Sequence, residues 1–322
     1  MTQETRSKII LAIDPFEEAL RPSRKALREL HYWAQKLSSR IEAVYVLRES
    51  DDRPEFGRLF TQAYDRLGGV VRSLDLRVPV SLRVIWDGDD ETRDAPGILT
   101  DYARETGADL ILVSSHGRKW LSRMVLGSFA EKVLMKASVP VLFFGVLPGP
   151  HESLHKVLFA TDFSDASKIA YELFLKQVGP MEPEVVILHV AEYPNLVTGM
   201  SLAGVGAYLP DAYWKVMKES LLSEGAAWVG IARKRGLRAR AVIEDGLGDV
   251  ASAILKTARA EKASLIGLST MRSELQKIVM GSVSTRVFRT RAHSVWVCGP
   301  GVLEKHPVPP ARHPPLIGRE MR

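Results

Sequence analysis

An internal repeat constrains this chain most, because self-similarity fixes the domain plan before any single element is assigned. The segment 8–14 (KIILAID) recurs as 156–162 (KVLFATD), and each copy is an apolar run that ends in aspartate. Further landmarks recur in the same order, and these are 108–115 with 263–270, 127–128 with 281–282, and 139–144 with 293–298. The shared order indicates two copies of one folding unit.

Between the landmarks, apolar runs of strand length alternate with longer segments of helical periodicity, which is typical of parallel strands joined by crossover helices. In the first half we expect strands near 8–13, 41–47, 79–85, 109–114 and 139–144, and helices near 16–38, 55–75, 96–106 and 128–137. In the second half we expect strands near 156–161, 184–191, 237–243, 264–269 and 293–298, and helices near 165–178, 211–235, 248–260 and 282–290. The prediction is an α/β protein of two tandem doubly wound domains, each a five-stranded parallel sheet flanked by helices.

The length of 322 residues leaves room for two separate cores, since domains usually run to about 100–200 residues. We place the first domain at 1–146, a linker rich in Pro and Gly at 147–155, and the second domain at 156–299. The remaining segment, 300–322, is rich in proline and is expected to be a flexible tail that builds no core.

Composition argues against several classes of protein. The net charge of +6 comes from Lys and Arg residues scattered along the expected helices, whereas a nucleic-acid surface needs a basic patch. The single cysteine, Cys298, cannot form an internal disulfide, and no His/Cys cluster has the spacing of a zinc site. The apolar run 9–13 is too short for a signal peptide or a membrane span. We therefore expect a cytoplasmic protein with no metal site, no nucleic-acid partner and no membrane partner.

Ligands of open α/β sheets bind beyond the carboxyl ends of the strands, where the strand order reverses. This rule selects Asp14, which follows the first strand, and the segment 113–118, which follows the fourth. Gly127 and Ser128 then open a helix, where a glycine lets the backbone approach an anion and free N–H groups attract it. Ser115 and Ser128 add hydroxyl donors. The alternative is an ordinary helix cap without a ligand.

The aspartate, the glycine loop and the closing Pro-Val strand together resemble the universal stress protein family, whose fold is similar to that of the adenine nucleotide alpha hydrolases. The resemblance covers nearly the whole chain apart from the tail. In the ATP-binding members the aspartate binds the ribose, backbone at the end of the second strand frames the adenine, and the glycine loop holds the phosphates. The resemblance implies these cofactor-binding roles for Asp14, Val46, Val113, Ser114, Ser115, Gly117, Gly127 and Ser128.

Two features of the first-half loop qualify that implication. Ser114 stands where the family has its first glycine, so its side chain is expected to crowd the ribose or the α-phosphate. Asp14 is the one carboxylate placed near the loop, so a magnesium ion would be held through the phosphates of ATP and through water.

The second half keeps the aspartate, as Asp162, and the end of its second strand, as Val190. Its loop has no glycine between Gly267 and Gly281. Met271 and Arg272 stand where the His-Gly pair of the first-half loop would lie. We therefore expect the second half to bind no nucleotide. It would serve instead as the partner of the first half in an intramolecular pseudo-dimer joined through the last strand of each half.

The resemblance implies a stress-response sensor or adaptor that binds ATP or a related nucleotide in its first domain. We assign no residue to catalysis. His116 lies in the loop without a paired carboxylate, and no hydrolase or Walker motif is present. One alternative is a scaffold for a protein partner or an apolar small molecule, which the apolar stretch 195–214 favours. A slow ATPase or autokinase is a third. A homodimer or a regulatory protein partner stays open.

A sequence in the second half, 246–251 (GLGDVA), matches the dinucleotide fingerprint G-x-G-x-x-A in its glycine spacing. The acidic residue that this fingerprint requires about 20 residues further on is missing, because that region reads Gly267-Leu268-Ser269-Thr270. We therefore interpret the sequence as a tight turn between a strand and a helix.

Overall fold

The computed structural model of the protein describes residues 7–16, 24–47, 56–74, 76, 78–86, 94–113, 128–144, 154–191, 211–245, 249–270, 282–290 and 293–305. The first half contains β1 (Lys8–Ala12), α1 (Arg24–Lys36), β2 (Arg40–Leu47), α2 (Phe56–Ser73), β3 (Val80–Trp86), α3 (Ala95–Glu105), β4 (Leu110–Val113), α4 (Ser128–Lys136) and β5 (Val141–Phe143). The second half contains β6 (Lys156–Ala160), α5 (Asp165–Val178), the 3-10 helix η4 (Gly179–Met181), β7 (Glu184–Ala191), α7 (Asp211–Arg233), β8 (Ala239–Asp245), α8 (Val250–Ala260), β9 (Leu265–Ser269), α9 (Ser282–Thr290), β10 (Ser294–Cys298) and α10 (Pro300–Leu303).

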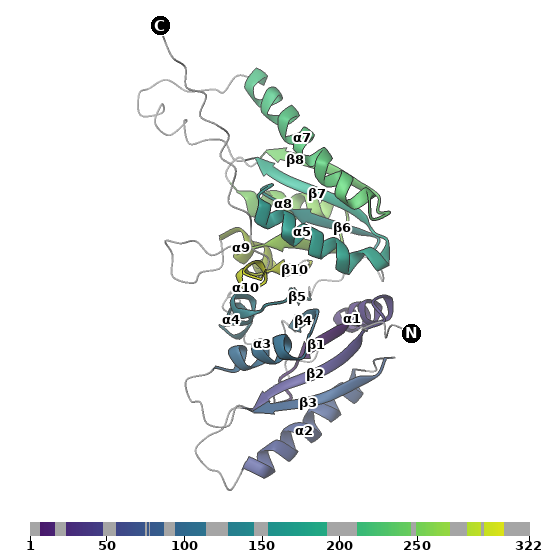
Figure 1. Cartoon of the computed structure of the whole chain (residues 1–322), viewed down its shortest axis with the longest axis vertical. Helices are drawn as coiled ribbons and strands as arrows, with labels where there is room; N and C mark the ends of the chain where they lie inside the picture. Colours follow the sequence, from purple (N-terminus) through teal and green to yellow (C-terminus); the bar gives the residue numbers. More distant parts are fainter. Residues whose placement is uncertain are drawn as a thin grey trace, which may run out of the picture.

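The predicted fold class is confirmed, and its two sheets are joined into one. The strand order is β3-β2-β1-β4-β5-β10-β9-β6-β7-β8 (Figure 1). Within each half the strands are parallel, and the order reverses between β1 and β4 and again between β6 and β9. Parallel strands covered on both faces consist of nearly continuous apolar residues, and all four residues of β4 are buried. These two reversal points are where ligands of such sheets bind.

Each face of the sheet carries its own core, because side chains alternate between the two faces along a strand. One core includes Trp33 of α1 and Trp228 of α7. The other includes Leu99 of α3 and Ile254 of α8. Burying a large apolar side chain contributes about 1.5–3 kcal/mol, so residues of this kind hold the helices on the sheet.

Helix starts follow capping chemistry in both halves. Asp94 accepts a hydrogen bond from the backbone N–H of Gly97 at 3.0 Å and begins α3, and Asp249 accepts one from Ala251 at 3.2 Å and begins α8. Such caps contribute about 1 kcal/mol each. The acidic residue of the GLGDVA sequence therefore caps a helix, while 246–248 lie outside the described residues.

The two halves meet at β5 and β10, which pair antiparallel with Phe143 opposite Val295. These are the strands that the sequence places last in each half. Phe143 also packs edge-on against Phe288 of α9, with ring centroids 4.9 Å apart. The pairing covers one edge of each five-stranded sheet, and an uncovered edge is a site of aggregation.

A glutamine side chain ties the halves together beside this strand pair. Gln177 of α5 donates from Nε2 to the backbone oxygen of Asp109 in the first half at 2.6 Å. Its Oε1 accepts a hydrogen bond from Nε1 of the buried Trp296 at 2.7 Å. At the same junction, the Ser294 hydroxyl donates to the Glu29 carboxylate of α1 at 2.5 Å.

The expectation that 300–322 is a flexible tail is wrong for its first residues. Pro300 begins α10, and Val302 and Leu303 are buried against the core. α10 packs on α4 of the first half. The sequence suggested a tail because of its proline content, but proline also suits the first turn of a helix. Residues 306–322 lie outside the described residues.

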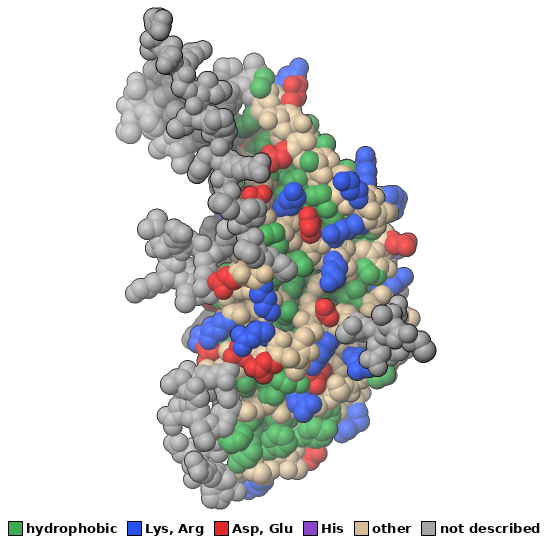
Figure 2. Space-filling view, in the orientation of Figure 1, with side chains coloured by type: hydrophobic (Ala, Val, Ile, Leu, Met, Phe, Trp, Pro, Cys, Tyr) green, Lys and Arg blue, Asp and Glu red, His purple; other side chains and the backbone are tan. Residues whose placement is uncertain are grey.

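The described surface carries mixed charge over the face that Figure 2 shows. Lys and Arg side chains lie among Asp and Glu side chains there, without one basic block. On this face the basic residues behind the net charge of +6 are scattered and not clustered.

We predict that Gly299→Ala destabilises the junction between the halves. A Cβ atom at Gly299 would lie 2.2 Å from the backbone oxygen of Leu134 in α4, and backbone cannot move aside as a flexible side chain can. The free energy of unfolding in urea should fall by about 1–3 kcal/mol.

The control is Gly69→Ala in α2, where a Cβ atom meets nothing within 4 Å. This change should raise the free energy of unfolding by about 0.5–1 kcal/mol, because alanine favours a helix more than glycine does. Equal effects at the two positions would contradict the close packing of α10 on α4.

Candidate functional site

Asp14 lies at the carboxyl end of β1, at the point where the strand order of the first half reverses. The last residue of β1, Ala12, is paired with Val44 of β2 on one side and Val113 of β4 on the other. Ile13 donates its backbone N–H to Val44 at 3.0 Å, so the chain leaves the sheet at Asp14. The Asp14 carboxylate is half-buried and accepts the backbone N–H of Phe16 at 2.9 Å, which forms an Asx turn.

An aromatic cluster lies next to Asp14. The ring of Phe16 packs on Tyr45 of β2 with centroids 5.6 Å apart, and the guanidinium of Arg66 in α2 lies 4.9 Å from the Phe16 ring. Burial raises the pKa of Tyr45 to about 12, and the negative charge of Asp14 adds to this rise. Asp14 therefore lies next to an aromatic pair, Phe16 and Tyr45, whose Phe16 ring contacts a cation.

Val46, predicted to frame an adenine, and Val113, the first residue of the predicted loop, both lie at the carboxyl ends of their strands. Val46 is two residues past Val44, level with Asp14, and is buried beside Ile85 of β3. Val113 ends β4 and is also buried. Their side chains belong to the core, so only their backbone is available to a ligand.

The structure describes only part of the predicted phosphate loop. Ser128 begins α4, and its side chain lies outside the described part of the chain. The remaining predicted residues also lie outside it, and these are Ser114, Ser115, Gly117 and Gly127, together with His116. The structure thus brings together Asp14, Val46 and Val113, and the loop stays a prediction.

The equivalent aspartate of the second half, Asp162, is engaged by its own chain. Its Oδ1 accepts hydrogen bonds from the Ser164 backbone N–H at 3.0 Å, the Ser164 hydroxyl at 2.6 Å and the Ser167 hydroxyl at 2.6 Å. Ser167 lies in turn 2.8 Å from the hydroxyl of Ser269 at the end of β9. Desolvation would raise the pKa of Asp162, but the serine hydrogen bonds outweigh it and hold that pKa below its usual value.

The sequence analysis missed the roles of Ser167 and Ser269. Ser164 caps α5 by accepting the Ser167 backbone N–H at 3.2 Å, so serines three residues apart after an aspartate were the available signal. Ser269 gave no such signal, because its contact with Ser167 joins residues far apart in the sequence.

A strained phenylalanine follows Asp162. Phe163 has φ of 61°, a left-handed conformation that is uncommon for a bulky residue. Its ring stacks on His189 of β7 at 4.7 Å between centroids and packs edge-on against Trp228 at 5.5 Å. Thr161 supports both residues, because its hydroxyl accepts the Phe163 N–H at 2.8 Å and its carbonyl lies 2.9 Å from His189 Nδ1. In each half an aromatic ring therefore packs on the second strand. The neighbouring carboxylate is bonded to a backbone N–H in the first half and mainly to serines in the second.

Two further properties bear on what the site can bind. In the described segments, no group of three or more His, Cys, Asp or Glu side chains is placed to hold a metal ion. Among the described helices, none combines the length and the apolar composition that a membrane span requires.

Comparison with known proteins gives matches along most of the chain. A family model described as the universal stress protein family matches residues 5–144 and 153–299. Universal stress protein YxiE of Bacillus subtilis (strain 168) is 29% identical over 138 residues, which cover 41% of this chain and 90% of that protein. The YxiE match is therefore about one repeat long.

Solved structures match both halves at once. A universal stress protein from Archaeoglobus fulgidus DSM 4304 has a TM-score of 0.58 at 21% identity and covers 92% of this chain and 97% of its own. A protein from Pseudomonas aeruginosa PAO1, described as functionally unknown, has a TM-score of 0.60 at 16% identity and covers 94% of this chain and 95% of its own. At these identities the likeness shows the fold.

We predict that Asp162→Asn destabilises the protein and reduces its sensitivity to acid. At pH 7 the free energy of unfolding should fall by about 1 kcal/mol, because a charged acceptor of several hydrogen bonds is lost. The folded-state pKa of Asp162 lies below the value in the unfolded chain, about 3.9. Its contribution to stability is therefore present above about pH 4 and is lost as the pH falls through the folded-state pKa.

Urea unfolding of both proteins between pH 3 and pH 7 measures this contribution. The two stability curves should approach one another at the acid end. Curves that stay parallel throughout would show that the Asp162 charge does not stabilise the start of α5.

Proposed function

Because the chain belongs to the universal stress protein family and so to the stress response, we propose that its first half binds ATP or a related nucleotide. In this proposal the protein is a sensor or adaptor whose nucleotide state is read by a partner, and no residue is assigned a catalytic role. The observation that carries the proposal is the state of Asp14. Among the described residues its carboxylate, which lies at the strand reversal, accepts one hydrogen bond and has acceptor positions left over.

The accepting capacity of the two aspartates differs. An ionised carboxylate offers about four lone-pair sites, and among the described residues Asp14 uses one of them, for Phe16. The remaining lone-pair sites would accept hydrogen bonds from ribose hydroxyls. Asp162 already holds donors from Ser164 and Ser167 on Oδ1, so we assign it to the start of α5 rather than to a nucleotide.

The surroundings of Asp14 suit the rest of a nucleotide. Backbone at Val46 would frame the adenine, and the Phe16 ring with Arg66 would border it. The N–H groups around Gly117 and Gly127 would hold the phosphates, as glycine loops at helix starts do. Magnesium would be bound through phosphate oxygens and water, and Ser114 would lower the affinity by crowding the sugar.

The direct test is to identify what the purified protein carries. The chain is denatured immediately after purification, and the released small molecules are separated by anion-exchange chromatography and identified by mass. We expect an adenine nucleotide at up to one per chain. An empty protein that also fails to bind added ATP would refute the proposal and favour the scaffold that the sequence left open.

We predict that the two aspartates respond differently to mutation. Asp14→Ala should weaken ATP binding roughly 10–100-fold in a calorimetric titration, since hydrogen bonds to a charged group contribute about 1.5–3 kcal/mol. Gly117→Met should weaken it comparably, because a side chain there obstructs the backbone donors.

Asp162→Ala is the matched control and should leave ATP affinity nearly unchanged, although it is expected to destabilise α5. Circular dichroism of each variant separates lost binding from lost folding. Two nucleotides per chain, or equal losses from Asp14→Ala and Asp162→Ala, would show that the second half binds as well.

A further inference from the structure

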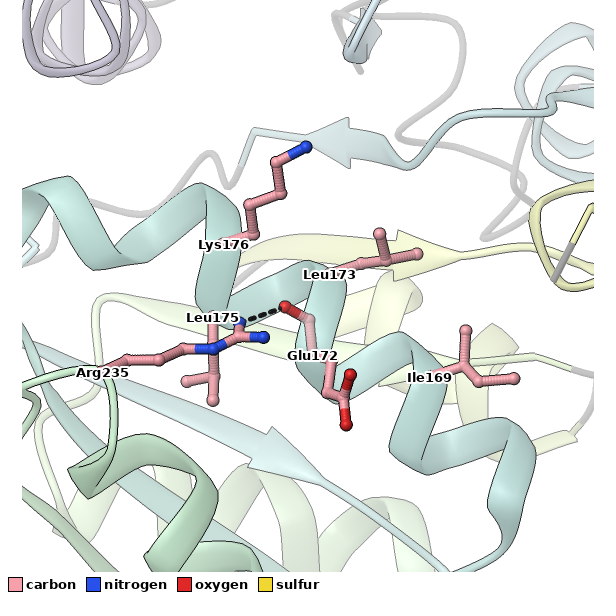
Figure 3. Close-up of a pocket in the computed structure, with 6 residues that line it drawn as sticks. All are labelled: Ile169, Glu172, Leu173, Leu175, Lys176 and Arg235. Carbon is pink, nitrogen blue, oxygen red and sulfur yellow. Dashed lines mark hydrogen bonds between the residues drawn. The ribbon is translucent and has the colours of Figure 1, made fainter.

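A groove of about 480 Å³ runs along α5 in the second half (Figure 3). Its lining residues are Ile169, Glu172, Leu173, Leu175, Lys176 and Arg235. Lys176 belongs to the last turn of α5, and Arg235 precedes β8, so both lie toward the amino ends of the strands. Asp162 lies at the carboxyl ends of the strands, on the opposite side. The groove is therefore separate from both strand-reversal sites.

The floor of the groove is aliphatic. Leu175 is buried, and Ile169 and Leu173 are half-buried and pack against the core. Among the described lining residues none is aromatic, so they offer no flat surface on which a nucleobase stacks. A flexible hydrocarbon group fits this surface better than a nucleotide does.

Two cations border the groove. Arg235 donates from Nη1 to the backbone oxygen of Glu172 at 2.6 Å, which fixes the guanidinium across α5 (Figure 3). Among the described residues no other acceptor binds its remaining N–H groups. Lys176 is exposed, and among the described acids none forms an ion pair with it. The Glu172 carboxylate points away from Lys176, and the three charged side chains sum to +1.

We propose that this groove binds a small amphipathic anion, with one carboxylate-like head group at Lys176 or Arg235 and a short hydrocarbon chain along Ile169 and Leu173. The volume lies within the range of about 300–1,000 Å³ that is usual for small-molecule sites. The cations favour a negative head group, and the aliphatic floor favours an apolar tail. This inference concerns the second half and does not depend on nucleotide binding by the first.

The probe is octanoate, titrated into the full-length protein by calorimetry at low salt, with the neutral 1-octanol as the matched ligand. Octanoate should bind saturably with one site per chain and more tightly than octanol. The double variant Lys176→Gln, Arg235→Gln should weaken octanoate binding roughly fivefold, because the head group loses its exposed cationic partner whichever of the two it contacts. Leu173→Asn should weaken both ligands, since it interrupts the apolar floor.

The control is Lys168→Gln, which removes an exposed cation of α5 outside the groove and should leave octanoate binding unchanged. Asp14→Ala should also leave it unchanged, which separates this inference from the proposed nucleotide site. The proposal is overturned by an absence of saturable binding, by full affinity in the double variant, or by an equal loss in Lys168→Gln.

Discussion

The antiparallel pair of β5 and β10 is the contact on which the whole arrangement depends, because it converts two five-stranded sheets into one. Both faces of a parallel sheet have to be covered, and its edge strands have to be protected. Here each half protects one edge strand of the other. Gly299 then lets α10 approach the backbone of α4, and Gln177 bridges Asp109 and Trp296 beside the strand pair. Strand pairing, close backbone packing and a half-buried amide therefore act at one junction.

The repeat carries two different uses of one strand-end aspartate. In the first half Asp14 accepts one hydrogen bond from the described residues, at the strand reversal and near Tyr45. In the second half the same position is tied to Ser164 and Ser167, which stabilises the start of α5. In the proposed function, the first copy of the domain holds the ligand site and the second copy uses its aspartate for stability. The serine hydrogen bonds to Asp162 are what distinguishes the second copy from the first.

Helix α5 connects the features of the second half. Its first turn carries Ser167, which reaches the end of β9 through Ser269. Its aliphatic residues form the floor of the groove, and its last turn carries Gln177 into contact with the first half. One rigid helix thus links the second strand-reversal site, the proposed anion site and the junction of the halves.

Much of this protein follows from the sequence alone. The repeat and the alternation of apolar runs with helical segments determined the α/β class, the tandem plan and the positions of the strands, since burial on both faces demands a local apolar pattern. The position of Asp14 followed in the same way, because residues after β1 meet residues after β4 wherever the strand order reverses.

Only the tertiary structure decided the properties that join residues distant in the chain. It showed Asp162 engaged by serines, Ser269 in contact with Ser167, and α10 folded onto α4 where proline content suggested a tail. Hydrogen bonds and close packing of this kind depend on where a side chain lies in space, which composition and periodicity do not specify. The sequence determined which residues lie at the carboxyl ends of the strands. The fold decided which of them are bound by their own chain.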